Sequence, residues 1–159
     1  MSLTLTSGLL IGATVLGGLL AGSNFDRALL AMPAWRRLGP TAWTDFSRHA
    51  DLGNGLILYP VEAIGAAVLT IAAAISIHFD DAPALATWIL NVAVVLAIGG
   101  LLLTVKAAPI MLGIRETTDP DKLRRAFDGF HYWGNLRAIC QVLAFPALVL
   151  ALAALRGLP

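Results

Sequence analysis

The chain has 159 residues, a formal net charge of +1, 58% hydrophobic residues and only 13% charged residues. Because soluble domains carry about a quarter charged residues, this composition excludes an ordinary soluble domain. The basic residues are mixed with acidic ones and form no clean basic face, which argues against a nucleic-acid partner.

Apolar residues gather in four blocks, at 3–22, 56–77, 83–104 and 138–155. Each block has about the 20 residues that cross the hydrocarbon core of a bilayer. No Lys or Arg precedes the first block, so we expect a membrane helix there and not a cleaved signal peptide. The sequence predicts one all-α domain over residues 1–159, an integral membrane four-helix bundle. Short connections favour an up-down arrangement with antiparallel neighbours.

Ten of the eleven Lys and Arg residues fall in the stretches after the first block and between the third and fourth, and only Arg156 falls on the other side. By the positive-inside rule, the side with the ten cations is cytoplasmic and both termini lie outside.

The first helix is expected over about 3–30, ending before Pro33 and the turn at 38–40. Gly18 and Gly22 form a GxxxG motif, which favours a close helix neighbour. That neighbour is either another helix of this chain or a second copy in a homodimer.

The second helix is expected over 42–77, with Thr41 as its cap and its first turns outside the hydrocarbon on the cytoplasmic side. Pro60 leaves the carbonyl of Leu56 without its helical donor. The polar residues of this helix gather near its start: His49, Asp51, Tyr59 and Glu62.

The third helix is expected over about 83–112, with Pro109 bending or ending it. The fourth helix is expected over 120–155, with Asp119 as N-cap and Pro120 at the first position. At 1.5 Å per residue it is roughly 50 Å long, so its first third extends beyond the bilayer on the cytoplasmic side.

A row of polar residues opens the fourth helix. Asp128, His131 and Asn135 share one helical face, and Arg137 lies on a neighbouring face. We hypothesise that His131 is a general base, because its unperturbed pKa lies near neutrality. Asp128 orients its ring, and Asn135 or Arg137 holds an oxyanion.

Helices two and four bring their polar residues to the same end, which predicts a cytoplasmic-side pocket for a lipophilic small molecule. Its substrate-binding residues are predicted to be Trp133, Tyr132, Tyr59, Glu62 and His49. Each of these roles has an alternative that stays open. Tyr132 and Trp133 would then belong to an aromatic belt at the membrane interface in place of a binding site. Similarly, His131 would then be a solvated interfacial residue, and Asp128 would pair with Arg124.

Two segments resemble the anthrone-oxygenase-like family of small four-helix membrane proteins: TVKAAPI at 104–110 and FHYWGNLRAICQVLAF at 130–145. Pro109, Trp133 and Arg137 match the family's Pro after helix three and its Trp-x-x-x-Arg entry to helix four. The chain departs from the family at Ile110 and Met111, where members often have Asn. The resemblance implies an oxidoreductase that oxygenates a tricyclic phenolic anthrone to a quinone with dioxygen, without a metal or flavin cofactor.

A metal site is an alternative, since five residues of ligand type occur in helices two and four: His49, Asp51, Glu62, Asp128 and His131. No Glu-x-x-His spacing is present, and Asp51 and Glu62 lie roughly 16 Å apart along a helix. We therefore expect no metal, and a haem held by His49 and His131 is less favoured still. The alternative function is a non-catalytic membrane protein that binds a lipid-like ligand or a partner helix. Four short helices leave little room for a transporter.

Glu62 is the only charged residue well inside an apolar block. An unpaired carboxylate there costs several kcal/mol. We expect it to pair with Arg137 in preference to Lys106, or to face the pocket alone in its protonated form.

Overall fold

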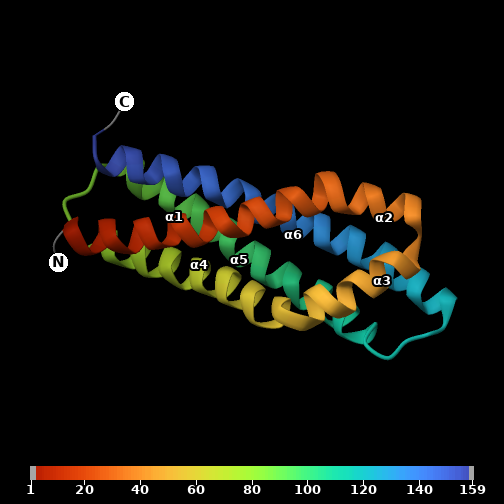
Figure 1. Cartoon of the computed structure of the whole chain (residues 1–159). Helices are drawn as coiled ribbons and strands as arrows, with labels where there is room; N and C mark the ends of the chain where they lie inside the picture. Colours follow the sequence, from red (N-terminus) through yellow and green to blue (C-terminus); the bar gives the residue numbers. More distant parts are fainter. Residues whose placement is uncertain (1–2, 158–159) are drawn as a thin grey trace.

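The computed structural model describes residues 3–157 and shows four long helical columns in an up-down bundle (Figure 1). The described chain contains no strand. The ends of the predicted domain, residues 1–2 and 158–159, lie outside the described residues. All four columns are long and apolar enough to cross a bilayer, so the chain is an integral membrane protein.

The described helical segments follow one another along the chain as α1 (Leu3–Asp26), a π-helical turn (Arg27–Ala31), α2 (Met32–Leu38), α3 (Pro40–His49), a second π-helical turn (Ala50–Asn54), α4 (Gly55–Ile77), α5 (Ala84–Gly113) and α6 (Pro120–Leu155). α1 packs against α4 and α6, and α5 packs against the same two helices. Columns that follow one another in sequence are therefore neighbours in space, which confirms the predicted all-α up-down bundle. The start of α1 and the end of α6 lie at the same end of the bundle (Figure 1), and we call the opposite end, with α2, α3 and the 114–119 connection, the basic end.

The first column is longer than the sequence predicted, because Pro33 does not end it. Pro33 lies in the first turn of α2, directly after the first π-helical turn. A first helical turn tolerates proline, because the missing N–H would have no helical acceptor there. The helix ends six residues later at Gly39, whose φ of 95° is in the region that glycine favours.

The second column begins at Pro40, not at a Thr41 cap, and it is interrupted. The second π-helical turn contains Gly53 at φ −93° and ψ −119°, outside the helical region. This kink separates α3 from α4. The extension predicted for the second and fourth helices is present at the basic end, with columns of 38 and 36 residues, and the first column is nearly as long at 34.

α6 begins as predicted. The Asp119 carboxylate accepts hydrogen bonds from the backbone N–H groups of Asp121 (2.9 Å) and Lys122 (3.4 Å), and Pro120 occupies the first turn. α5 does not end at Pro109 but continues to Gly113. Its last turns are held by packing, since Ala107 and Met111 are buried in the apolar cluster of the basic end.

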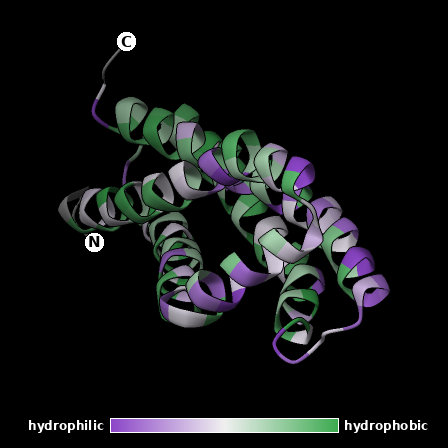
Figure 2. Cartoon of the chain, turned by 45° about the vertical axis from the view of Figure 1, so that its right-hand side comes forward, coloured by the Kyte–Doolittle hydropathy of each residue, from purple (hydrophilic) through white to green (hydrophobic). Residues whose placement is uncertain are grey.

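Two apolar clusters hold the bundle at its two ends. The cluster near the termini is built from small and aliphatic residues, among them Leu10, Leu90 and Leu148. The cluster at the basic end is aromatic: fully buried Trp43 of α3 lies 5.4 Å from the Phe127 ring and 5.6 Å from the Phe130 ring of α6. Hydrophilic residues gather around this second end (Figure 2).

The GxxxG motif is used within the chain at Gly18. A Cβ there would lie 3.0 Å from the Phe145 ring of α6, so glycine permits the close approach of α1 and α6. Gly22 has nothing within 4 Å of a Cβ. The predicted homodimer stays a prediction.

Candidate functional site

A cavity of about 450 Å³ lies between the two apolar clusters, bounded by α1, α4, α5 and α6. Its walls are mostly aliphatic, with Leu20, Leu101, Ala108 and Met111 among them. Polar side chains line it from all four columns, and its charged residues come from the two π-helical turns and from α6.

The two π-helical turns supply an ion pair to this cavity. Arg27 is the first residue of one turn, Asp51 lies in the other, and the Arg27 guanidinium pairs with Asp51 Oδ1. The same Arg27 Nη2 donates to the Tyr59 hydroxyl at 3.0 Å, and the guanidinium lies 5.3 Å from the Tyr59 ring centre. Asp51 is 4% exposed, and its second oxygen, Oδ2, is buried without a hydrogen-bond partner.

A second arginine lies beside this pair. The Phe130 ring has Arg27 at 5.9 Å and Arg137 at 6.0 Å, so one ring faces two cations. Among the described residues, Arg137 makes no ion pair and no hydrogen bond, and its Nε is buried without a partner.

An amide pair closes the side of the cavity between α1 and α6. Asn24 Nδ2 donates to Gln141 Oε1 at 2.8 Å and to the Leu20 carbonyl at 2.7 Å. Gly100 of α5 makes room for Gln141, because a Cβ there would lie 2.9 Å from Gln141 Cγ.

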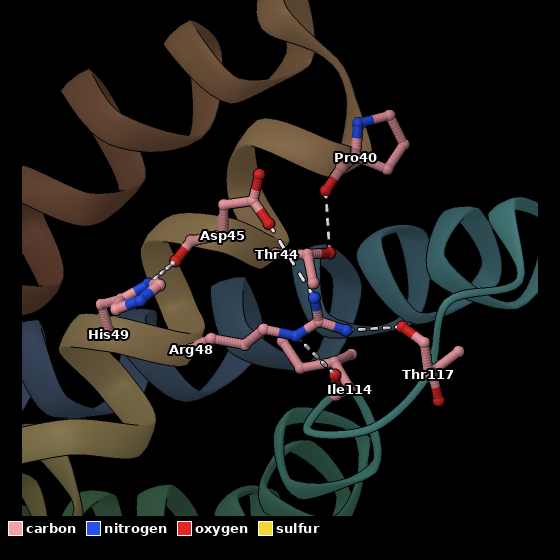
Figure 3. Close-up of polar contacts among 7 residues, drawn as sticks. All are labelled: Pro40, Thr44, Asp45, Arg48, His49, Ile114 and Thr117. Atoms are coloured by element: carbon pink, nitrogen blue, oxygen red, sulfur yellow. Dashed lines mark hydrogen bonds and ion pairs between the residues drawn. The ribbon is translucent and has the colours of Figure 1, made fainter.

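The segment that carries Asp51 is anchored by Arg48 of α3 (Figure 3). Arg48 Nε donates to the Ile114 carbonyl at 3.1 Å, and Nη2 donates to the Thr117 carbonyl at 2.6 Å. These bonds tie α3 to the 114–119 connection and satisfy a carbonyl at the end of α5. Fixing α3 also fixes the start of the π-helical turn in which Asp51 lies.

Of the site residues predicted from the sequence, Tyr59 and Arg137 line the cavity. Asn135 lines a cleft of about 10 Å³ next to it, together with Arg137. Its Nδ2 lies 3.4 Å from His131 Nε2, and His131 is half-buried but does not line the cavity.

The other predicted site residues lie elsewhere. Asp128 and His49 are exposed, and His49 Nδ1 lies 2.8 Å from the Asp45 carbonyl (Figure 3). Tyr132 is 59% exposed and contacts Trp133 with ring centres 5.0 Å apart, while Trp133 packs on the aromatic cluster. Asp128, His131 and Asn135 share a face as predicted, but the side chains that this part of the helix buries are others, among them Phe127, Phe130 and Gln141.

Glu62 forms neither of the ion pairs considered for it. It is 5% exposed, and within the described chain it makes no ion pair with Arg137 or Lys106. Its Oε2 is buried without a hydrogen-bond partner. Glu62 precedes Gly65 by three residues on α4, and Gly65 closely approaches Leu16 of α1. Glu62 therefore lies toward the α1 side of α4, and it is not a cavity-lining residue.

Sequence reasoning missed Arg27 and Phe130 as cavity residues, and it gave Asn24 and Gln141 no role. A signal was present in the spacing. Asn24 and Arg27 are three residues apart, and Arg137 and Gln141 are four apart, so each pair presents polar groups on one helical face.

In the described part of the chain, no three His, Cys, Asp or Glu side chains gather closely enough to hold a metal ion. Comparison with known proteins gives no match, whether to a family, to a curated protein or to a solved structure. The cavity and the residues that line it are therefore the features of the chain that indicate a function.

Proposed function

We propose that this integral membrane protein binds a lipophilic, aromatic small molecule in the cavity and catalyses its base-assisted, cofactor-free oxygenation by dioxygen. The size of the cavity supports this, since small-molecule sites are apolar clefts of roughly 300–1,000 Å³ with a few polar groups. Ionisable residues within a membrane bundle are, by default, functional candidates.

The observation that carries the proposal is the juxtaposition of a buried carboxylate and a second, unpaired cation at one cavity wall. Asp51 has one oxygen engaged by Arg27 and the other without a partner. Arg137 lines the same cavity. A base and a fixed cation are the two groups that carbanion or phenolate chemistry requires.

For an anthrone, the reaction is balanced as follows. Asp51 takes a proton from the ring CH₂, and the resulting charge spreads to the carbonyl oxygen, which faces Arg137. The carbanion carbon bonds to dioxygen, and the proton returned by Asp51 completes a hydroperoxide. Loss of water from CH–OOH leaves the quinone carbonyl. This scheme assigns the base to Asp51, because His131 does not line the cavity.

The proposal includes an orientation of the bundle in the membrane, which follows from the distribution of Lys and Arg. The basic end faces the cytoplasm and both termini lie outside, so the cavity is in the cytoplasmic half of the bilayer.

The test is turnover of anthrone by detergent-purified protein, followed by oxygen uptake and by the absorbance of the quinone. We expect Asp51→Asn to lose turnover, whereas His131→Ala retains it. Glu62→Gln is a matched control, since it neutralises a buried carboxyl of the same column that does not line the cavity. Full turnover by Asp51→Asn would overturn the assignment of the base.

A non-catalytic ligand-binding protein is the second candidate. It is favoured by the ion pair itself, because Asp51 is already engaged by Arg27. Saturable binding of anthrone by the wild-type protein, with no oxygen uptake above that of anthrone alone, would select this candidate.

A further inference from the structure

The charges at the cavity wall do not cancel. Three charged residues line the cavity, namely Arg27, Asp51 and Arg137, and the remaining polar lining residues are neutral. Arg27 and Asp51 pair with each other. One positive charge, that of Arg137, is left over.

No other described acid compensates Arg137. Glu62 is a candidate from the apolar part of the bundle, but it forms no ion pair among the described residues and does not line the cavity. Asp128 is exposed. The contact of Arg137 with the Phe130 ring, at 6.0 Å, is a weak compensation for a charge within a membrane bundle.

The cavity also reaches the lipid-facing surface. The large apolar residues that both line it and are exposed come from two helices: Leu56 and Ile64 from α4, and Val105 and Leu112 from α5. These side chains are 41% to 67% exposed. The gap between α4 and α5 is therefore the side from which a molecule dissolved in the bilayer reaches Arg137.

We propose that the ligand is a lipophilic monoanion, with a carboxylate or phenolate group on an apolar body, which enters between α4 and α5 and pairs its charge with Arg137. A guanidinium can bind a carboxylate through two parallel hydrogen bonds, and such charge-assisted bonds are stronger than neutral ones. The inference rests on the proposed function, because it takes the cavity to be the ligand site, and it adds the charge of the ligand and its route.

Two fluorescent probes with the same three rings test the charge, 9-anthracenecarboxylate and 9-anthracenemethanol. Their affinities for the detergent-purified wild-type protein are measured by anisotropy, with protein-free micelles as the blank. We expect the carboxylate to bind at least tenfold more tightly than the alcohol. Equal affinities would overturn the charge inference while leaving the cavity as a ligand site, and binding of neither probe would contradict the proposed function itself.

Variants then locate the charge. Arg137→Gln is expected to lower the affinity for the carboxylate to that for the alcohol, and Arg137→Lys to keep a part of the preference, because lysine retains the charge without the fork of donors. Lys106→Gln is the matched control, since it removes an exposed cation of α5 outside the cavity and leaves the preference unchanged. Retention of the full preference by Arg137→Gln would refute the role of Arg137. If Arg137→Gln does not fold, the wild-type comparison and Arg137→Lys still decide the question.

Competition with oleate distinguishes two classes of anionic ligand, membrane-derived acyl-chain anions and aromatic acids or phenols. Displacement of bound 9-anthracenecarboxylate by oleate, but not by oleyl alcohol, would assign the site to acyl-chain anions of the membrane. Binding of the aromatic carboxylate that resists oleate would assign it to aromatic acids and phenols. Displacement by both compounds alike would contradict a charge-selective site.

Discussion

The side chains of Arg27 and Asp51 are expected to be strongly coupled in their effect on stability. Replacing both should therefore cost less free energy of unfolding than the sum of the two single replacements. The side chains are 17% and 3% exposed, respectively. Removing one partner of a buried pair costs about 3–5 kcal/mol, because the other charge is left uncompensated. Asp51→Asn would in addition leave Arg27 and Arg137 as two uncompensated cations, 5.9 and 6.0 Å from the centre of the Phe130 ring.

We therefore expect Arg27→Met and Asp51→Asn each to lower the free energy of unfolding by about 3 kcal/mol or more. The double variant should lose less than the sum, with a coupling energy of about 1–3 kcal/mol. The measurement is unfolding of the purified protein in mixed micelles of rising SDS content, followed by circular dichroism.

The pair between Asp45 and Arg48 provides the control. Its atoms are 3.9 Å apart and its side chains are 63% and 28% exposed. Such a surface pair contributes only about 0–1 kcal/mol, so Asp45→Asn should change stability little. Additive costs for Arg27→Met and Asp51→Asn would refute the reasoning, because they would mean that the two charges do not depend on each other.

Three further predictions concern topology, helix contact and the second buried acid. A protease site inserted at 80–84 should be cut from outside intact cells, and one at 117–121 only after lysis; the opposite pattern would invert the proposed orientation. Gly18→Leu should lower stability by about 1–3 kcal/mol through overpacking, whereas Gly22→Leu should not, since its Cβ site is open. A shift of Gly22→Leu from dimer to monomer on size exclusion would support the homodimer, and equal costs at both glycines would contradict the packing described. Glu62→Leu should raise the free energy of unfolding by about 1–3 kcal/mol, because it removes a buried oxygen without a partner; a loss would show that Glu62 has a stabilising contact.

The spans and the start of α6 could be predicted because their causes are local. A run of apolar residues is long enough to cross a bilayer whatever surrounds it, and Asp119 caps the two N–H groups that follow it in the sequence. The extension of the first column was missed because the tolerance of Pro33 depends on the π-helical turn before it.

The site was predicted only in part because its residues meet through helical phase. Tyr59 and Arg137 were identified by their chemistry, and both line the cavity. Arg27 was not identified, since its partner Asp51 lies 24 positions away and is turned toward it by the second π-helical turn. The spacing of Asp128 and His131 showed that they share a face, but not that Phe127 and Phe130 take the buried one.

Because Arg27 and Asp51 both lie in π-helical turns, the ion pair depends on two one-residue insertions in the helices. Such a turn contains one more residue than the α-helical turn it replaces, so it absorbs that residue and leaves the helix beyond it in the same rotational phase. A single-residue deletion within 27–31 or within 50–54 would thus convert that turn to an α-helical one and displace Arg27 or Asp51 locally, while the apolar spans keep the faces with which they pack. Homologous chains built without this pair are expected to align with one-residue gaps at both places.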